Sequence, residues 1–290
     1  MSNPEKNIIV SALVVTYNST AGVGSCLTAL LDETARVGGE VIVFDNRSQD
    51  DTVPMIKREF PGVTLYESER NLGFGGANNR AAEKARGKYL LLANPDMLLD
   101  AGALKALVEA YESRPDAGAV VARLRNTNGT FQPTCRNFPD YYNIFFSRGS
   151  VLNQKGLPKP KNARPTYTLG DFGEITAIPA ASAACLLIER EFFLEIGGFD
   201  PRFFLFMEDT DLSLRIKQAG RKIYFVPEAN ALHHWGRGSS ISMIRRSWYH
   251  HMSVWRYYMK HFPNGFSLLV LPVALLANFV VRSLIGFDPR

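Results

Sequence analysis

The stretch IIVSALVVTYN, residues 8–18, decides the fold class of this chain. Its first eight residues are apolar except for Ser11, and side chains that form hydrogen bonds then follow at Thr16, Tyr17 and Asn18. A continuous apolar run of this kind is typical of a strand buried on both faces, as in parallel sheets. The run therefore predicts an inner strand of an α/β domain, with polar side chains at its carboxyl end.

Similar apolar runs alternate with helical stretches along the chain, which predicts a layered α/β fold. Between residues 126 and 173 the alternation is lost, and several prolines and lysines predict a long, partly mobile connection with a short aromatic helix at 141–146. Strands are predicted at 40–44, 63–66, 89–93, 117–124, 223–226 and 229–232, and at the end of 175–188. Helices are predicted up to Thr34 and at 53–60, 77–86, 101–113, 191–196 and 208–220.

Polar residues follow several of these strands at the point where each strand ends. Asp45 comes directly after the strand at 40–44, and Asn94 and Asp96 follow the strand at 89–93. Open α/β sheets bind ligands beyond the carboxyl ends of their strands, so these side chains are candidates for a binding site. A carboxylate on a rigid turn suits a divalent metal that also binds phosphate. A simple turn residue is the alternative for Asp96.

A glycine-rich stretch, NLGFGGANN at 71–79, opens the helix predicted at 77–86. Glycines at a helix entry allow a phosphate to approach the backbone, which makes Asn71 and Gly73 candidates for substrate binding. A tight turn explains the glycines equally well. Their spacing does not match the G-x-G-x-x-G pattern of dinucleotide-binding proteins, which argues against an oxidoreductase that uses a nicotinamide cofactor.

The stretch FFLFMEDTDLSLR, residues 203–215, places three carboxylates after an aromatic run and at the start of a helix. An apolar wall beside Glu208 or Asp209 would raise the proton affinity of the carboxylate, which suits a general base. The structural alternative is that Asp209 caps the helix and that Asp211 pairs with Arg215 one turn later.

Adjacent histidines, His233 and His234, follow the last predicted strand. Neighbouring side chains on a strand point to opposite faces, so at most one of them faces a given site. A single histidine is more often a hydrogen-bonded core residue than a ligand. With Asp96 as a second ligand, a metal site becomes a reasonable hypothesis.

Composition excludes several broad classes of function. The net charge of +5 is mildly basic, but the lysines and arginines form no dense block, so nucleic acid is not an expected partner. The three cysteines are far apart and form neither a disulfide framework nor a metal-ligand pattern. We expect them to be reduced and buried in a cytoplasmic protein. The N-terminal residues do not resemble a signal peptide.

The composition changes from Ile241 onward, where arginines alternate with tryptophans and tyrosines. The stretch FSLLVLPVALLANFVVRSLI at 266–285 then has about the length of a membrane span, but Pro272 and Arg282 interrupt it. We therefore predict a pair of helices that lies on a membrane surface. Packing on the domain or on a second copy of the chain is the alternative.

Taken together, six stretches resemble the inverting glycosyltransferases of family 2, and within them the bacterial rhamnosyltransferase type. The resemblance covers residues 8 to about 240. It rests on VVTYNS (14–19), DNRSQDDT (45–52), NLGFGGANN (71–79), NPD (94–96), GGFDPRFFLFMEDTDLSLR (197–215) and HHWGRGSS (233–240).

The resemblance implies a GT-A fold, a Rossmann-like nucleotide-binding mixed sheet flanked by helices. Residues 1–240 would form the catalytic domain, and residues 241–290 would form a C-terminal helical appendage that associates with the membrane.

The resemblance also implies roles for individual residues. Thr16, Tyr17, Asn18 and Asp45 would bind the nucleoside of the donor. Asp96 would hold Mg²⁺ or Mn²⁺ on the donor diphosphate, with Asn94 standing where many members have a first aspartate. His233 would be the second metal ligand, with His234 as the alternative. Asp209 would be the catalytic base, supported by Glu208.

The activity implied is transfer of a sugar, with L-rhamnose from dTDP-L-rhamnose as the preferred donor, in O-antigen or cell-wall synthesis. The acceptor would be a hydroxyl of a lipid-linked or polysaccharide glycan at the inner face of the cell membrane. Other UDP, GDP or dTDP hexoses are alternative donors. A non-catalytic scaffold that binds a glycan or nucleotide is the alternative from another class, and a homodimer is left open.

Overall fold

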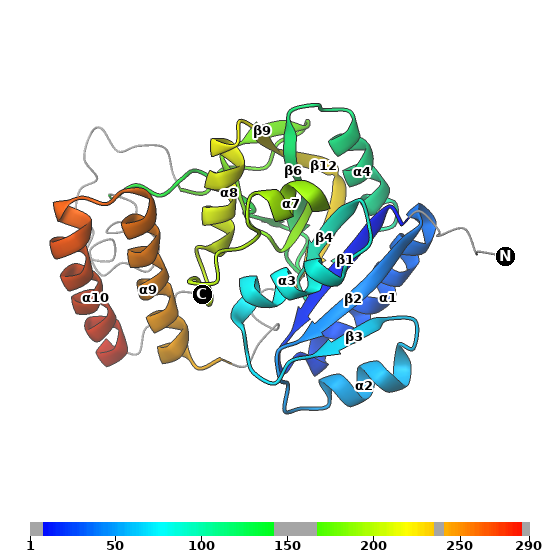
Figure 1. Ribbon diagram of the computed structural model, residues 1–290, viewed down its shortest axis with the longest axis horizontal. Helices are drawn as coiled ribbons and strands as arrows, with labels where there is room; N and C mark the ends of the chain where they lie inside the picture. The colour runs from blue at the N-terminus through cyan, green and yellow to red at the C-terminus, as the bar shows by residue number, and fades with distance from the viewer. Residues whose placement is uncertain (1–7, 142–166, 235–240, 286–290) are drawn as a thin grey trace.

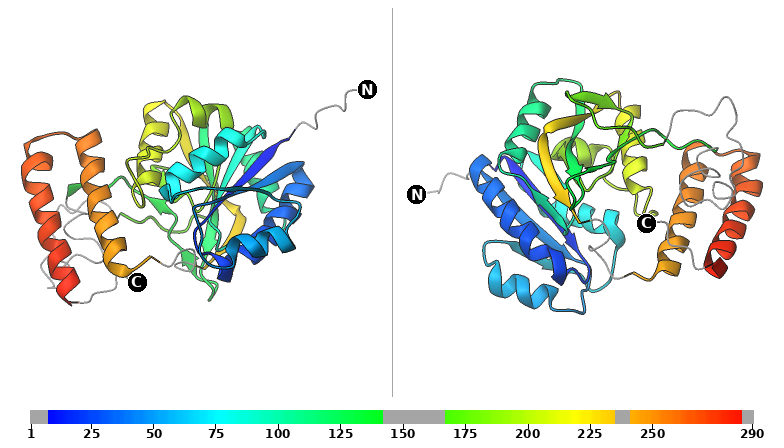
Figure 2. Two further views of the ribbon diagram at one scale, coloured as in Figure 1. Left: turned by 60° about the horizontal axis from the view of Figure 1, so that its bottom comes forward. Right: turned by 180° about the vertical axis from the view of Figure 1, so that it is seen from behind.

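The computed structural model describes residues 8–141, 167–234 and 241–285. A central mixed sheet carries helices on both faces, and two C-terminal helices lie side by side at one end of the molecule (Figures 1 and 2). The predicted α/β class is confirmed. Of the short aromatic helix predicted at 141–146, only Tyr141 lies within the described residues, and the division predicted at residue 240 falls outside them.

The strands follow the predicted runs closely in the first half. They are β1 (Val10–Thr16), β2 (Gly39–Asp45), β3 (Thr64–Glu67), β4 (Tyr89–Ala93), β5 (Met97–Leu99), β6 (Ala117–Arg125), β7 (Phe131–Gln132), β8 (Cys135–Arg136), β9 (Thr176–Ile178), β10 (Ala180–Ala181), β11 (Cys185–Glu189) and β12 (Lys222–His233). The helices are α1 (Thr20–Val37), α2 (Thr52–Glu59), α3 (Gly73–Lys84), α4 (Ala103–Glu112), α7 (Arg190–Glu195), α8 (Glu208–Gln218), α9 (Met243–His261) and α10 (Leu271–Ile285), with a π-helical turn at Phe266–Val270.

The main sheet has the order β3-β2-β1-β4-β11-β6-β12-β5. The four strands from β3 to β4 are parallel, whereas β11 is antiparallel to both of its neighbours. The two strands predicted at 223–226 and 229–232 form one strand, β12. Its register against β6 shifts between Val226 and Asn230, where Pro227 removes a ladder donor.

Two apolar layers, one on each face of the sheet, explain the continuous apolar run of β1. Val10, Ala12 and Val14 belong to the layer under α1, α2 and α4. Leu13 and Val15 belong to the opposite layer, under α3, α7 and α8. Because successive side chains point to opposite faces, a strand covered on both sides needs apolar residues at nearly every position.

A third apolar cluster joins the C-terminal helices to the rest of the molecule. Phe203 and Met207, just before α8, pack with Val254, Tyr257 and Tyr258 of α9 and with Leu271 and Leu275 of α10. Among the described residues, no helix is both long enough and apolar enough to cross a membrane. The described cysteines are unpaired and buried, as predicted.

Candidate active site

The carboxyl ends of β1 and β2 bring Thr16 and Asp45 together, because these residues are partners in the parallel ladder. The hydroxyl of Thr16 donates to Asp45 Oδ1 at 2.7 Å, and both side chains are buried. Ser48 donates to the same carboxylate from its backbone N–H at 2.7 Å and from its hydroxyl at 2.5 Å. Three donors therefore fix the orientation of Asp45. Ser48 was not predicted as a site residue.

The loop after β1 is interlocked with the loop after β2. Asn18 has a left-handed backbone conformation, with φ of 51°. Its backbone N–H donates to Ser48 Oγ at 2.8 Å, and its side-chain oxygen accepts from the N–H of Gln49 at 2.7 Å. Tyr17 lies between these anchored positions and is half-buried. The residues on both sides of Tyr17 are thus bonded to the end of β2 and to the loop after it.

The glycine-rich turn is held against a second loop. Asn71 Oδ1 accepts from the N–H of Gly73 at 2.9 Å, and Asn46 binds the same turn through the carbonyl of Gly73. Gly73 has φ of 76°, and a Cβ at this position would lie 2.3 Å from the carbonyl oxygen of Phe204. Close packing against the loop before α8 therefore accounts for Gly73. Substrate binding by Asn71 and Gly73 stays a prediction.

The turn after β4 faces the end of β12. Asp96 Oδ1 lies 3.2 Å from His233 Nε2, and Asn94 Nδ2 lies 3.1 Å from the same nitrogen. The antiparallel pairing of Met97 with His233 produces this proximity, and both Asp96 and His233 are almost fully buried. The next residue, His234, contacts the same turn through its backbone, whose N–H donates to the carbonyl of Asp96. The residues predicted as metal ligands are thus adjacent, with His233 beside Asp96.

Gln132 on β7 determines how His233 presents its nitrogen atoms. Its Oε1 lies 2.6 Å from His233 Nδ1, and its amide nitrogen donates to Asn126 Oδ1. His233 Nδ1 is therefore the donor, and the lone pair of Nε2 faces both Asn94 Nδ2, at 3.1 Å, and Asp96 Oδ1, at 3.2 Å. Residues that orient a metal-binding histidine act in this way. Sequence reasoning missed Gln132 because it lies 101 positions from His233.

The pair formed by Asp96 and His233 fits a divalent metal. A nitrogen lone pair and a carboxylate oxygen at 3.2 Å repel each other unless a cation or a proton lies with them. Two ligands at about 2.1 Å from an octahedral ion, at right angles, are about 3.0 Å apart. The described residues contain no group of three His, Cys, Asp or Glu side chains around one point. Asp96 and His233 alone would therefore leave most positions of such an ion open to other ligands.

The first turn of α8 is entered through an unusual backbone. Phe206 and Met207 both have positive φ, at 69° and 64°. Non-glycine residues rarely adopt this conformation, and such positions are concentrated at functional sites. The N–H of Phe74 donates to the carbonyl of Phe204, which ties this loop to the glycine-rich turn. The strained entry determines where Glu208 and Asp209 point.

Glu208 and Asp209 have different environments. Glu208 is buried, and its Oε2 has no hydrogen-bond partner among the described residues. Burial, followed by the charge of Asp209, raises the pKa of Glu208 to about 8. Asp209 Oδ2 instead accepts from Arg136 Nη1 at 3.0 Å, and its Oδ1 accepts from the N–H of Thr210 at 2.7 Å. At neutral pH the site thus holds a protonated Glu208 beside an Asp209–Arg136 ion pair.

Asp211 points away from this site and has a structural role. Its buried carboxylate accepts from Arg215 at 2.9 Å, as predicted, and also from Lys260 at 2.6 Å and His261 at 2.7 Å. Burial opposes ionisation, but these donors lower the pKa of Asp211 below its ordinary value. The last turn of α9 is therefore attached to the first turn of α8.

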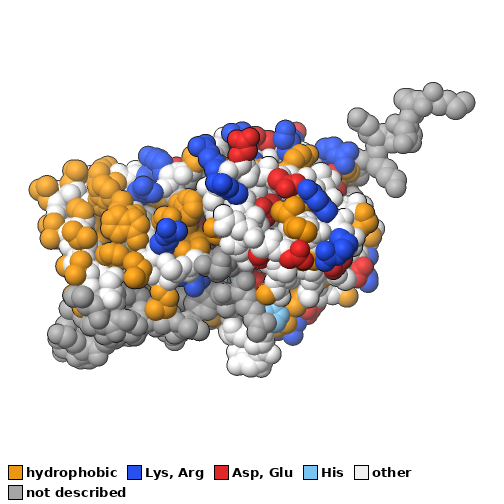
Figure 3. Space-filling model, turned by 90° about the horizontal axis from the view of Figure 1, so that it is seen from below, with side chains coloured by type: hydrophobic (Ala, Val, Ile, Leu, Met, Phe, Trp, Pro, Cys, Tyr) orange, Lys and Arg blue, Asp and Glu red, His pale blue; other side chains and the backbone are white. Residues whose placement is uncertain are grey.

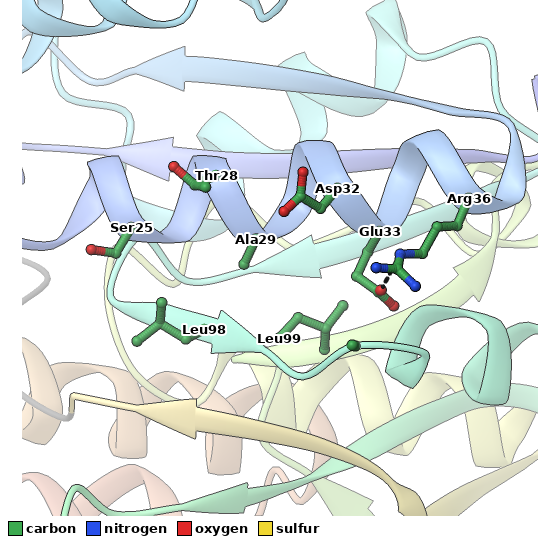
Figure 4. Close-up of a pocket in the computed structure, with 9 residues that line it drawn as sticks. Ser25, Thr28, Ala29, Asp32, Glu33, Arg36, Leu98 and Leu99 are labelled. Atoms are coloured by element: carbon green, nitrogen blue, oxygen red, sulfur yellow. Dashed lines mark ion pairs between the residues drawn. The ribbon is translucent and has the colours of Figure 1, made fainter.

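The groups at the strand ends adjoin one another. Gly22, in the first turn of α1, approaches the 94–96 turn so closely that a Cβ there would lie 3.3 Å from the Cβ of Asp96. A separate cavity of about 400 Å³ lies between α1 and β5 (Figure 4). It contains none of the predicted site residues, and Glu33 in its wall accepts from the N–H groups of Gly102 and Leu104. That carboxylate caps α4 and has a structural role.

Comparison with known proteins gives a consistent pattern. The sequence model of the family described as "Glycosyl transferase family 2" matches residues 11–197. The N-acetylglucosaminyl-diphospho-decaprenol L-rhamnosyltransferase of Mycobacterium tuberculosis is 32% identical over 239 residues, which cover 78% of this chain and 76% of the relative. Rhamnosyltransferase WbbL of Escherichia coli is 25% identical over 226 residues, which cover 75% of this chain and 81% of the relative.

Solved structures agree with the sheet topology. GalNAc-T7 with UDP, GalNAc and Mn²⁺ superposes with a TM-score of 0.60 at 19% identity, over 87% of this chain and 48% of that chain. The mannosyltransferase PcManGT from Pyrobaculum calidifontis, with GDP-Man and Mn²⁺, superposes with a TM-score of 0.59 at 18% identity, over 99% of this chain and 78% of that chain. At these identities the comparison supports the fold.

Proposed function

This chain belongs to glycosyl transferase family 2 and has the GT-A fold, and from that premise we propose that it transfers L-rhamnose from dTDP-L-rhamnose to a lipid-linked acceptor. The observation that carries the proposal is the buried pair of Asp96 and His233, 3.2 Å apart at the substrate edge of the sheet. The sugar and the acceptor are taken from the names of relatives at 32% and 25% identity.

In this proposal, the loops after β1 and β2 bind the nucleoside. Asp45 is held by Thr16 and Ser48, and its Oδ2 retains capacity to accept a hydrogen bond from the N–H of a pyrimidine base. Tyr17 offers a ring for stacking, and Asn18 maintains the loop that carries it. Because hydrogen bonds already hold these side chains in place, less conformational entropy is lost when the nucleoside binds.

Asp96 and His233 would hold Mg²⁺ or Mn²⁺ against the donor diphosphate. The ion, when bound, would neutralise negative charge that develops on the leaving nucleoside diphosphate. Gln132 holds His233 with Nε2 directed at Asp96, and Asn94 Nδ2 lies 3.1 Å from that Nε2 atom. Asn94 is a neutral amide, whereas an aspartate at this position would add a second negative charge. In the pair of Asp96 and His233, the negative charge is therefore that of Asp96.

Asp209 is the proposed base. It accepts the proton of the acceptor hydroxyl while the hydroxyl oxygen forms a bond to the anomeric carbon. The bond from that carbon to the diphosphate oxygen breaks, and the diphosphate leaves with the electron pair. Attack opposite the leaving group inverts the anomeric configuration. Arg136 holds Asp209 in an ion pair, and Glu208, protonated at neutral pH, can donate a hydrogen bond without adding charge.

The proposed location is the cytoplasmic surface of the cell membrane. Apolar side chains gather at the end of the molecule formed by α9 and α10, with Lys and Arg side chains at the border of this surface (Figure 3). The exposed apolar residues there include Leu268, Leu269, Val270, Val273, Leu276 and Val280. An apolar helical face with basic residues nearby suits the interface of an anionic membrane.

Nucleotide release from a panel of sugar nucleotides tests the proposal, with a membrane lipid extract as the acceptor. We expect release from dTDP-L-rhamnose, dependent on the lipid extract and lost when EDTA removes divalent ions. Release from a UDP or GDP sugar instead would replace the donor and keep the reaction class. Release that persists in EDTA would refute the metal role of Asp96 and His233. Binding of a sugar nucleotide in a separate titration, without release from any donor in the presence of the lipid extract, would favour a non-catalytic scaffold.

A further inference from the structure

The loop before α8, residues 202–207, lies along one face of the helix α9. The ring centroids of Phe204 and Tyr249 are 4.6 Å apart, and those of Phe206 and His250 are 5.5 Å apart. Two further side chains of the loop belong to the third apolar cluster, together with side chains of α9. The conformation of this loop therefore depends on a helix from the C-terminal part of the chain.

Backbone carbonyls of the loop are also bound from outside it. The glycine-rich turn binds one of them, and α9 binds two more. Arg256 Nη1 donates to the carbonyl of Arg202 at 2.5 Å, and Ser253 Oγ donates to that of Leu205 at 2.9 Å. Residues three positions apart on a helix are neighbours on its surface, so Ser253 and Arg256 lie on the same face of α9. This face restrains the backbone of the loop as well as its side chains.

Ser253 is the buried member of this pair, with 1% of its surface exposed. A serine inside a helix often donates to the carbonyl of its own helix four residues earlier. Ser253 donates instead to Leu205, which lies 48 positions earlier in the sequence. Among the residues that the structure describes, no other group donates to this carbonyl. Loss of the hydroxyl would therefore leave the Leu205 carbonyl without its donor.

The carbonyl of Leu205 lies directly before the strained entry to α8. Phe206 and Met207, the next two residues, are those with positive φ. Such conformations persist only where the surrounding structure holds them. Asp209 follows two residues after Met207, and its carboxylate lies 3.0 Å from Arg136 Nη1. A loop that relaxed at Leu205 would move this carboxylate out of its present position.

We propose that Ser253 is a positioning residue for the transfer reaction: by binding the Leu205 carbonyl, it keeps the loop before α8 in the conformation that places Asp209. The inference rests on the proposed function, because Asp209 is the proposed base. Ser253 acts through the loop and takes no part in the bond changes. The reaction therefore depends on α9 for the geometry of its base, whether or not this helix also contacts a membrane.

Steady-state transfer by full-length Ser253→Ala tests the proposal. We expect kcat to fall at least about tenfold, because a small displacement of a reacting group is costly, while the KM of the sugar nucleotide stays within about twofold. Alanine is the better helix former, so α9 itself should persist. Ser247→Ala is the matched control on the same helix, because the Ser247 hydroxyl has no hydrogen-bond partner within the described residues, and its kcat should stay within about twofold of the wild type.

A double-mutant cycle distinguishes positioning of the base from a general loss of structure. In the Asp209→Asn background, Ser253→Ala should slow the residual transfer by less than about twofold, because the group that it positions is already absent. A full second loss of about tenfold would show that Ser253 acts independently of Asp209 and would overturn the proposal. An unchanged kcat in Ser253→Ala, or an equal fall in Ser247→Ala, would also overturn it.

Hydrogen exchange of the backbone amides of residues 202–207 provides a readout that needs no sugar transfer. Exchange in this segment should be at least about tenfold faster in Ser253→Ala than in the wild type, and unchanged in Ser247→Ala. Equal exchange in Ser253→Ala and the wild type would contradict the hold of Ser253 on the loop. If exchange is faster but the wild type transfers no sugar, the proposed function is wrong and the restraint of the loop by Ser253 is retained.

Discussion

Glu208 and Asp209 are neighbours in the sequence, yet Glu208 is buried with a raised pKa, whereas Asp209 forms an ion pair with Arg136. The sequence indicates that carboxylates begin a helix after an aromatic run, and that one of them can serve as a base. It does not indicate which one is neutral, because that depends on burial and on Arg136, which lies 73 positions before Asp209. The same applies to Gln132, whose contact with His233 depends on the pairing of β6 with β7 and β12.

The raised pKa of Glu208 predicts a pH-dependent stability. The folded state binds the proton of Glu208 up to pH about 8, whereas the unfolded chain releases it near the ordinary value of 4.5. The contribution of Glu208 to stability is therefore complete below pH 4.5 and is lost as pH rises towards 8. Glu208→Gln cannot ionise, so its melting temperature should exceed that of the wild type by several degrees at pH 8.5 and by less at pH 5.

Thermal unfolding across this pH range provides the measurement. Glu228→Gln is the matched control, since Glu228 is exposed, and its melting temperature should follow that of the wild type at each pH. If the curves of Glu208→Gln and the wild type were parallel from pH 5 to 8.5, the buried protonated state of Glu208 would be wrong.

At the scale of elements, the parallel half of the sheet could be predicted almost completely. Three of its strands, β1, β2 and β4, are short apolar runs followed by polar residues, and β1 alternates between two apolar layers. The segment between β6 and β11 could not be predicted, because strands as short as β7 and β8, of two residues each, have no periodicity to detect. Arg136 and Gln132 lie on these strands. These two residues orient Asp209 and His233, and neither was predicted from the sequence.

Gly73 shows how two elements depend on one position. A methyl group there would meet the carbonyl of Phe204 at 2.3 Å and would also require a strained φ of 76°. We expect Gly73→Ala to lower the free energy of unfolding by about 2 to 4 kcal/mol and to reduce transfer, because the loop before α8 must move. Gly102→Ala is the control, since φ is 83° but the added Cβ meets nothing within 4 Å.

Denaturant unfolding and the rate of sugar transfer measure these effects. The control should lose only about 1 kcal/mol, from backbone strain, and should keep its transfer rate. Equal losses of stability in both variants would mean that the close contact with Phe204 contributes nothing.

At the scale of the whole molecule, the C-terminal helices do more than cover an end of the domain. The composition change after residue 240 predicts a separate helical segment, and the helices α9 and α10 are confirmed. The composition does not predict that Lys260 and His261 bond to Asp211 or that Tyr257 packs with Phe203. These contacts are between residues distant in sequence, so deletion of 241–290 should disturb α8 as well as membrane binding.

Point substitutions separate the two effects. Leu269 and Val273 are 73% and 67% exposed, so replacing both by Gln should leave the fold unchanged. Each side chain would contribute about 1 kcal/mol or more to insertion into a lipid interface, so binding to anionic vesicles should fall at least about tenfold. Leu194→Gln, on α7 and 40% exposed, is the control for loss of an apolar surface residue. Equal cosedimentation of all variants would contradict the membrane surface proposed for α9 and α10.

The most direct test of the account is sugar transfer by Asp209→Asn, measured together with the affinity for the donor. The amide cannot accept the acceptor proton, so transfer should fall about 10²- to 10⁴-fold while the dissociation constant of the sugar nucleotide stays within about twofold. Glu208→Gln in the same assay should retain most of its activity at neutral pH, where Glu208 is already protonated. If Asp209→Asn transferred sugar at the wild-type rate and Glu208→Gln lost transfer activity, the account would be contradicted. The base would then be Glu208.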